Sequence, residues 1–164
     1  MLRWLPVVVV LGLLSGCGGP KSKRLNAGEV APAFEAERLA GGRLRFPEDL
    51  KGKVVVIRFW ADWCSFCEGE MKAVDAVYRR HQGIGLEVLA INAGQDRSKV
   101  AAFMGKIGVS YPALLDEAAI VSKRYGVGGL PTTFIVDRSG VVREKLLGEV
   151  DSATFERKLA AVLR

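Results

Sequence analysis

The sequence contains few of the side chains that bind metals. Its 164 residues include one histidine, His81, and three cysteines, of which only Cys64 and Cys67 lie close together. A structural zinc site needs about four ligands, and a catalytic site needs about three from the protein. Because the sequence has no second cysteine pair, it argues against a metal site. We therefore assign no metal, no other cofactor and no role to His81.

Concentrated positive charge is also lacking. The formal net charge is +6, but Lys and Arg are spread along the chain except for the group Lys21, Lys23 and Arg24. A surface that binds nucleic acid gathers its basic residues on one face or along one helix. The distribution of charge therefore argues against nucleic acid as a partner.

Long apolar runs are absent too. The N-terminal apolar run extends from Leu5 to Leu14, interrupted by Pro6 and Gly12, and follows Arg3. A membrane-spanning helix needs about 20 apolar residues, so this run is too short to cross a bilayer unaided. A short apolar run after a positive charge is typical of a secretory signal. We predict an export signal over residues 1–16, with an uncleaved anchor as the alternative.

The rest of the chain suits one domain preceded by a tether. Residues 17–27 contain Gly18, Gly19 and Pro20 followed by charged side chains, a composition with too little apolar surface to pack. We predict that they form a flexible tether. Residues 28–164 are long enough to bury a core of their own and are predicted to fold as a single domain.

The apolar pattern of this domain predicts an α/β fold, with a central mixed sheet and helices on both faces. Residues 54–60 are almost continuously apolar, as in a strand covered on both faces, and only Arg58 interrupts them. Apolar residues at helical spacing predict helices elsewhere, and Asp96 and Asp151 are expected to cap two of them. The predicted strands are 34–39, 43–46, 54–60, 86–91, 113–115, 132–136 and 141–147, and the predicted helices cover about 65–81, Asp96 to Gly108, Asp116 to Gly126, and the residues after Asp151.

Cys64 and Cys67 lie where the strand 54–60 ends and the next helix begins. Thiolate is the reactive form of cysteine, and the positive end of a helix stabilises it. With Cys64 in the first helical turn, we predict that Cys64 is the nucleophile and Cys67 the resolving thiol. A disulfide that closes so short a ring would stabilise the fold little, so the pair is predicted to be redox-active. A structural disulfide in a tethered binding module is the alternative.

Two separated segments resemble the thioredoxin superfamily. Residues 59–67, FWADWCSFC, are similar to its active-site segment, and residues 67–71, CEGEM, resemble the extension in its membrane-tethered TlpA/ResA-like branch. Residues 126–137, GVGGLPTTFIVD, are similar to the loop in which the superfamily has a cis-proline facing the two sulfurs. The resemblance implies a thioredoxin-like fold with an N-terminal β-hairpin and an inserted αβ unit, and the activity of a thiol-disulfide oxidoreductase.

The same resemblance implies roles for further residues. Glu70, one helical turn after Cys67, would exchange protons with the resolving thiol, and a partly dry pocket would raise its pKa toward neutrality. Pro131 would follow a cis bond that turns the backbone of Leu130 toward the cysteines, ready to pair with an extended substrate. Trp63 would add apolar contact surface. A solvated Glu70, a trans bond before Pro131 and a Trp63 that belongs to the core are the alternatives.

The residues Leu14-Ser15-Gly16-Cys17 resemble the cleavage box of a bacterial lipoprotein. The branch resemblance implies that Cys17 becomes a lipidated N-terminus, which would account for the odd third cysteine. A plain secretory signal with an unused Cys17 is the alternative. Outside the cytoplasm, facing the periplasm or the cell exterior, a dithiol needs electrons from a donor in the membrane to stay reduced. The implied substrates are thiols and disulfides of exported proteins, with cytochrome c biogenesis as one pathway.

Arg58 departs from the family pattern, because thioredoxin itself has a buried acid at the matching strand position. A cation close to the sulfurs would stabilise thiolate and make the protein more oxidising. The alternatives are an ion pair with Asp62 or Glu70, or a side chain that reaches solvent.

Two other departures concern the cysteine pair and its helix. Ser65 and Phe66 replace the small residue and the proline that are usual between the cysteines, and such residues influence the reduction potential. Lys72 stands where the branch usually has a proline that kinks the helix, so a straighter helix is expected.

Two other functions on the same fold are less compatible with the sequence. A thiol peroxidase would have a threonine near its reactive cysteine rather than a tryptophan and a C-x-x-C motif. A copper-delivery protein would require C-x-x-x-C and a distant histidine, and the sequence has neither in that arrangement.

Overall fold

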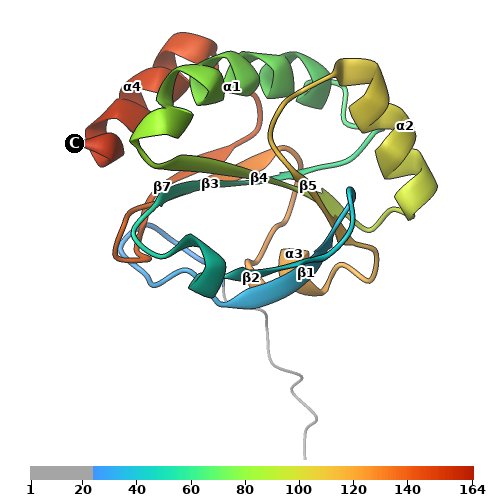
Figure 1. Cartoon of the computed structure of the whole chain (residues 1–164), viewed down its shortest axis with the longest axis horizontal. Coiled ribbons are helices and arrows are strands. Elements are labelled where there is room, and N and C mark those ends of the chain that lie inside the picture. The colour runs from blue at the N-terminus through green and yellow to red at the C-terminus, as the bar shows by residue number, and fades with distance from the viewer. Residues whose placement is uncertain (1–23) are drawn as a thin grey trace, which may run out of the picture.

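The structure is a computed structural model that describes residues 24–164 (Figure 1). The predicted export signal, Cys17 and most of the predicted tether lie outside the described residues. In the described part of the chain, no helix combines the length and the hydropathy that a membrane span requires.

A mixed sheet of seven strands forms the centre of the domain, in the order β2-β1-β5-β4-β3-β6-β7. β3 lies between β4, to which it is parallel, and β6, to which it is antiparallel. The β1–β2 hairpin lies at one edge and pairs with β5. The strands are β1 (Phe34–Arg38), β2 (Arg43–Phe46), β3 (Val54–Trp60), β4 (Leu86–Ala93), β5 (Ala113–Asp116), β6 (Thr132–Val136) and β7 (Val142–Leu147).

Helices cover both faces of this sheet, as predicted (Figure 1). The long helices α1, α2 and α4 lie on one side of β3 and β4, whereas α3 and the curled β1–β2 hairpin lie on the other. The α-helices of the described residues are α1 (Cys67–His81), α2 (Arg97–Ile107), α3 (Ile120–Arg124) and α4 (Ser152–Leu163), and two short 3-10 helices cover Glu48–Leu50 and Gln82–Ile84.

Two apolar cores form on the two faces, and β3 contributes to both. All seven of its residues are buried. Val56 and Trp60 belong to the core beneath α1, α2 and α4, and Ile57 and Phe59 belong to the core on the side of α3 and the hairpin. This alternation follows from the period of two along a strand. It places the side chain of Arg58 on the face covered by α1.

The predicted helix caps are confirmed. The carboxylates of Asp96 and Asp151 accept hydrogen bonds from the third backbone N–H after each of them, at the starts of α2 and α4. Gly108 ends α2 with a φ of 65°, a left-handed conformation that favours glycine. Asp116 accepts hydrogen bonds from the backbone N–H groups of Val121 and Ser122 in α3, although Ala119 is the residue at the cap position.

The structure extends two predicted strands and the packed domain. β5 continues to Asp116, one residue past the predicted end at Leu115. β4 continues to Ala93, two residues past the predicted end at Ile91, because it still pairs with β5 there. Leu25 is buried in the core on the side of α3, and its carbonyl accepts a hydrogen bond from Lys145. The packed domain therefore includes residues that were expected to belong to the tether.

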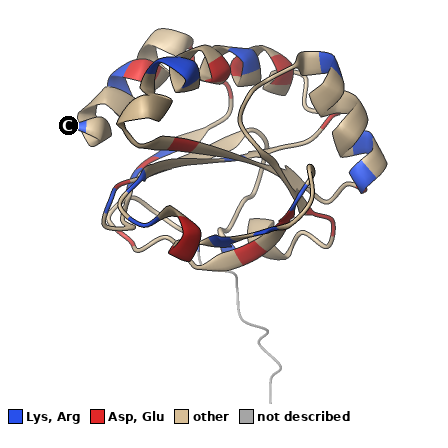
Figure 2. Cartoon of the chain, viewed as in Figure 1, with Lys and Arg blue, Asp and Glu red and all other residues tan. Residues whose placement is uncertain are grey.

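Lys and Arg are distributed over the helices, the strands and the loops between them, together with Asp and Glu (Figure 2). Several of these charges pair locally. Glu68 of α1 binds Lys72 of the same helix and Lys106 of α2. The hydrogen bond from Lys106, and to a smaller extent that from Lys72, lowers the pKa of Glu68 to about 2.

The turn between β6 and β7 depends on one carboxylate. Asp137 accepts hydrogen bonds from Ser139 and Val141 and binds Arg143. Burial alone would raise the pKa of Asp137, but these hydrogen bonds together lower it to about 2, from its usual 3.8. Because this pKa is lower in the folded than in the unfolded chain, the stabilisation is present above pH about 4 and disappears as the pH falls toward 2.

We therefore expect Asp137→Asn to lower the free energy of unfolding by about 1–2 kcal/mol at pH 7, because charge-assisted hydrogen bonds are lost. The difference from wild type should shrink as the pH falls from 5 to about 2. Urea denaturation across this pH range measures it, with Glu117→Gln at an exposed position as the control. A difference that does not depend on pH would contradict the assignment.

Candidate active site

The candidate site lies at one end of three central strands: β3 and β4 end there, and β6 begins there. Trp60, the last residue of β3, pairs with Asn92 of β4, and Phe59 pairs with Thr132, the first residue of β6. The segments that follow β3 and β4 and the segment that precedes β6 therefore meet there. These segments carry the two cysteines, Gln95 and Pro131 respectively.

Cys64 and Cys67 form a disulfide, with their Cα atoms 5.4 Å apart. The two sulfur-bearing residues differ in exposure, since Cys64 is 7% exposed and Cys67 is fully buried. Both belong to the core beneath α1. Of the two, Cys64 is therefore the residue that an approaching molecule can reach.

The prediction that Cys64 lies in the first turn of the helix is wrong. α1 begins at Cys67, with Phe66 at the cap position. The backbone N–H of Cys67 donates to the carbonyl of Cys64 at 3.0 Å, an i to i+3 bond that forms a turn and not an α-helix. Cys64 therefore precedes the helix by one turn, and Cys67 opens it. From there α1 runs as one helix past Lys72 to His81.

Arg58 lies on the face of the sheet that α1 covers and is buried, at 2% exposed. Its guanidinium forms an ion pair with Glu70, and it also donates to the hydroxyl of Thr133 at 2.9 Å. The other carboxylate oxygen of Glu70 accepts from the backbone N–H of Val150 at 2.7 Å. Of the alternatives for Arg58, the ion pair with Glu70 is thus the one that forms.

This pairing changes the environment that was expected for Glu70. Glu70 is buried, at 8% exposed, which does not fit the alternative of a solvated side chain. It is not an isolated carboxyl group in apolar surroundings, however, because a permanent cation contacts it. Desolvation and a neighbouring cation act on a carboxylate in opposite directions.

The peptide bond between Leu130 and Pro131 is cis, as predicted. Pro131 is buried, and Leu130 packs against both cores. Beside this loop lies a groove of about 410 Å³, whose lining includes Gly128, Gly129, Lys145 and Leu147. An added side chain at Gly128 or Gly129 would meet no atom within 4 Å, and neither residue has a positive φ. Packing and backbone conformation therefore do not require glycine at these two positions.

Two large apolar side chains are exposed on either side of Cys64. Trp63 is 68% exposed and Phe66 is 55% exposed. Trp60, in contrast, is fully buried and stacks on Phe103 of α2. The sequence suggested a surface role for Trp63, but it linked Phe66 only to the reduction potential. Its position between two cysteines at a helix start was the signal that this ring would face outward.

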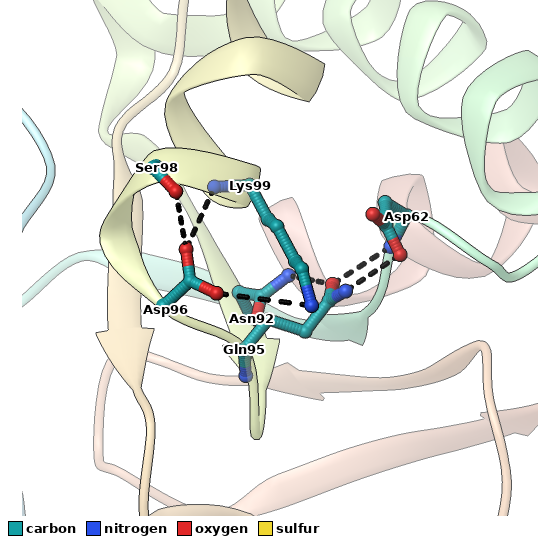
Figure 3. A network of polar contacts seen from close by, with 6 residues as sticks. All are labelled: Asp62, Asn92, Gln95, Asp96, Ser98 and Lys99. Atoms are coloured by element: carbon teal, nitrogen blue, oxygen red, sulfur yellow. Dashed lines mark hydrogen bonds and ion pairs between the residues drawn. The ribbon is translucent and has the colours of Figure 1, made fainter.

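A polar network connects the residues that precede Cys64 to the end of β4 (Figure 3). The side-chain oxygen of Gln95 accepts from the backbone N–H of Asp62 and from Asn92, each at 2.9 Å. Its amide nitrogen donates to the carboxylate of Asp62 at 2.5 Å. No motif or periodicity in the sequence marks Gln95 or Asn92 as part of the site.

Within the described residues, no group of three or more His, Cys, Asp or Glu side chains is arranged to hold a metal ion. His81 lies at the end of α1, and its ring nitrogen is 3.9 Å from the carboxylate of Glu156.

The sequence and the fold resemble those of known proteins. Residues 27–145 match the AhpC/TSA family. The thiol-disulfide oxidoreductase ResA of Bacillus thuringiensis (strain Al Hakam) is 32% identical over 163 residues, covering 94% of both chains. ResA of Geobacillus thermodenitrificans (strain NG80-2) is 35% identical over 135 residues, covering 82% of this chain and 77% of the relative.

Among solved structures, a protein identified as thiol:disulfide interchange protein DsbE from Chlorobium tepidum superposes with a TM-score of 0.81. It is 27% identical, and the match covers 85% of this chain and 99% of that one. Fold, family match and relatives agree with the predicted thioredoxin-like architecture. The chain therefore belongs to the AhpC/TSA family and is a thiol-disulfide oxidoreductase of the ResA-like kind.

Proposed function

We propose that the protein is an exported, lipid-anchored thiol-disulfide oxidoreductase that reduces or exchanges disulfides in exported proteins through Cys64 and Cys67. The observation that carries this proposal is the disulfide at the start of α1, in which Cys64 is the more exposed member. An attacking sulfur has to reach its substrate, whereas a resolving sulfur only has to reach its neighbour.

The reaction then proceeds in two exchanges, starting from the dithiol form. The thiolate of Cys64 attacks one sulfur of a substrate disulfide, forms a mixed disulfide and releases the other substrate sulfur as a thiolate. The thiolate of Cys67 next attacks the sulfur of Cys64, which closes the Cys64–Cys67 disulfide and releases the second substrate thiolate. Two electrons pass to the substrate, and both released thiolates take up protons. A dithiol donor in the membrane would return the protein to its reduced form.

Glu70 and Arg58 would act together in the proton steps. Cys67 has to lose its proton before it attacks, and Glu70 is one helical turn away on the same helix. Arg58 holds the Glu70 side chain in place and adds a positive charge on the face of the sheet where both cysteines are buried. A cation on this face favours the thiolate over the thiol, and the paired carboxylate of Glu70 reduces that effect.

Substrate would bind across the edge of the sheet that carries Leu130 and Pro131. The exposed rings of Trp63 and Phe66 provide apolar contacts there. The open space at Gly128 and Gly129 lets an extended chain approach the backbone of the loop. Recognition would then depend mainly on main-chain and apolar contacts, as suits an enzyme that acts on several proteins.

Export and anchoring are supported by the N-terminal sequence. The apolar run that ends at Leu14 and the box that ends at Cys17 would direct the chain out of the cytoplasm and attach lipid to Cys17. Residues 18–23 would then connect the lipid to the domain at the membrane surface. In that location, disulfides of apocytochromes in cytochrome c maturation are a candidate substrate class.

We expect Cys67→Ser to trap mixed disulfides between Cys64 and its substrates, because the resolving thiol is missing. Non-reducing electrophoresis of membranes from cells that make the variant, followed by mass spectrometry, identifies them. Cys64→Ser is the matched control and should trap far less. If neither variant forms mixed disulfides and the wild-type dithiol reduces no insulin disulfide, the proposed function is wrong.

Arg58→Met should make the reduction potential more negative by on the order of 30 mV, which corresponds to about 1.4 kcal/mol for a two-electron couple. The reason is that the thiolate loses a stabilising cation, while Glu70 remains buried without its partner. Breaking the pair should also cost about 3–5 kcal/mol of stability.

The double variant Arg58→Met/Glu70→Gln removes both charges and is the control for that experiment. It should recover most of the lost stability and bring the potential back toward the wild-type value. Equilibration with dithiothreitol measures the potential, and urea denaturation measures stability. An unchanged potential in Arg58→Met would remove Arg58 from the mechanism.

Replacing Trp63 or Phe66 by Ala should raise KM for a protein disulfide about three- to tenfold and change kcat little, because contacts with substrate are lost outside the reacting sulfurs. Insulin reduction measures both constants. Ile84→Ala, at another exposed apolar side chain, is the control. A fall in kcat with an unchanged KM would argue against a binding role.

A further inference from the structure

The segment that carries the reactive cysteine has few attachments to the rest of the domain. Residues 61–66 follow β3 and precede α1 without belonging to either. Ala61 and Cys64 are buried, but Trp63 and Phe66 are exposed, so apolar packing holds only part of this segment. Within residues 24–164, the hydrogen bonds that reach it from a side chain elsewhere come from Gln95 alone.

Gln95 is well suited to hold this segment. Its carboxamide is buried, and it contacts the Asp62 residue at two points, the backbone N–H and the carboxylate (Figure 3). One planar group that accepts at one point and donates at the other fixes both the position and the orientation of the segment.

Gln95 is itself held in place. Its side-chain oxygen accepts from Asn92, and its backbone N–H donates to the side-chain oxygen of Asn92 at 3.2 Å. Asn92 is fully buried and belongs to β4, where it pairs with Trp60 on one side and Leu115 on the other. The contact with Asp62, 33 residues away in sequence, is therefore anchored in the centre of the sheet.

The charge of Asp62 gives this contact a chemical consequence. Asp62 is the ionisable residue nearest to Cys64 in the sequence on its N-terminal side, and Gln95 binds its carboxylate. If the contact were lost, the carboxylate would be free to move toward Cys64, and a nearby negative charge disfavours thiolate. Other charges close to Gln95 are those of Asp96 and Lys99, which bind each other at the start of α2.

We propose that Gln95 is a positioning residue for the disulfide exchange: it holds Asp62 and thereby keeps Cys64 reactive and Trp63 in place. This inference deepens the proposed function and rests on the role that the function gives to Cys64. Gln95 does not contact the sulfurs in this role. It acts through the segment that precedes them.

The test uses the reduced protein and measures alkylation of Cys64 by iodoacetamide as a function of pH, with mass spectrometry to identify the modified residue. Gln95→Ala should slow alkylation of Cys64 at pH 7 about tenfold, the size of effect expected from the loss of one or two hydrogen bonds. The pH of half-maximal alkylation should move upward, and KM for insulin should rise. Ser98→Ala and Lys99→Met, which alter the neighbouring cap at Asp96, should leave all three unchanged.

A swap of the two side chains distinguishes a specific contact from a general loss of packing. Gln95→Glu alone places two carboxylates against each other and should slow alkylation at least as much as Gln95→Ala. In the double variant Asp62→Asn/Gln95→Glu, an amide again faces a carboxylate, and the introduced carboxylate can still accept from the backbone of residue 62 and from Asn92. Alkylation at pH 7 should return to within about threefold of wild type. Thermal unfolding shows whether each variant is folded, and the comparison of the Gln95→Glu and double variants does not require Gln95→Ala to fold.

Two results would overturn the inference. One is a folded Gln95→Ala variant with the wild-type alkylation profile, and the other is a double variant as slow as Gln95→Glu. These outcomes differ from a failure of the proposed function, which would appear as a wild-type dithiol that reduces no insulin, whatever the effect of Gln95 on alkylation.

Discussion

The buried ion pair between Arg58 and Glu70 joins the elements that surround the disulfide. Arg58 belongs to β3 and also binds Thr133 of β6, while Glu70 belongs to α1 and also binds the backbone of Val150, before α4. Removing two charges from water costs several kcal/mol per ion, and only good geometry with further hydrogen bonds offsets that cost. The pair is therefore favourable in few arrangements of the sheet and α1. Because α1 begins at Cys67, the same constraint fixes the position of the Cys67 sulfur.

The ion pair also links two features that the sequence presents as separate. A carboxylate on α1 and a cation on β3 each have a clear effect on a nearby thiol when considered alone, and the effects have opposite signs. In the structure the two groups contact each other, so a sulfur on this face meets a paired charge and not an isolated one.

Much of the fold follows from local patterns in the sequence. The strands at residues 43–46, 54–60 and 132–136 have the predicted bounds, because unbroken or alternating apolar runs between turn residues mark them. The start of α1 was harder to predict from the sequence, because a turn closed by a hydrogen bond to the carbonyl of Cys64 comes before the helix. The partner of Arg58 and the contact between Gln95 and Asp62 join residues far apart in the chain, and no periodicity specifies them.

The active-site segment illustrates how exposure and rigidity are reconciled in this molecule. A sulfur that reacts with large substrates must lie near the surface, and Trp63 and Phe66 are exposed beside it. Exposed rings contribute little to holding a backbone in place, because they bury little area. Further rigidity comes from buried polar groups: Arg58 and Glu70 join β3 to the first turn of α1, and Asn92 and Gln95 hold the segment before it. Such groups are stable only when their hydrogen bonds are made, so they allow few alternative positions. The division between exposed rings and buried polar groups that hold the backbone therefore gives Cys64 a fixed position beside an open surface.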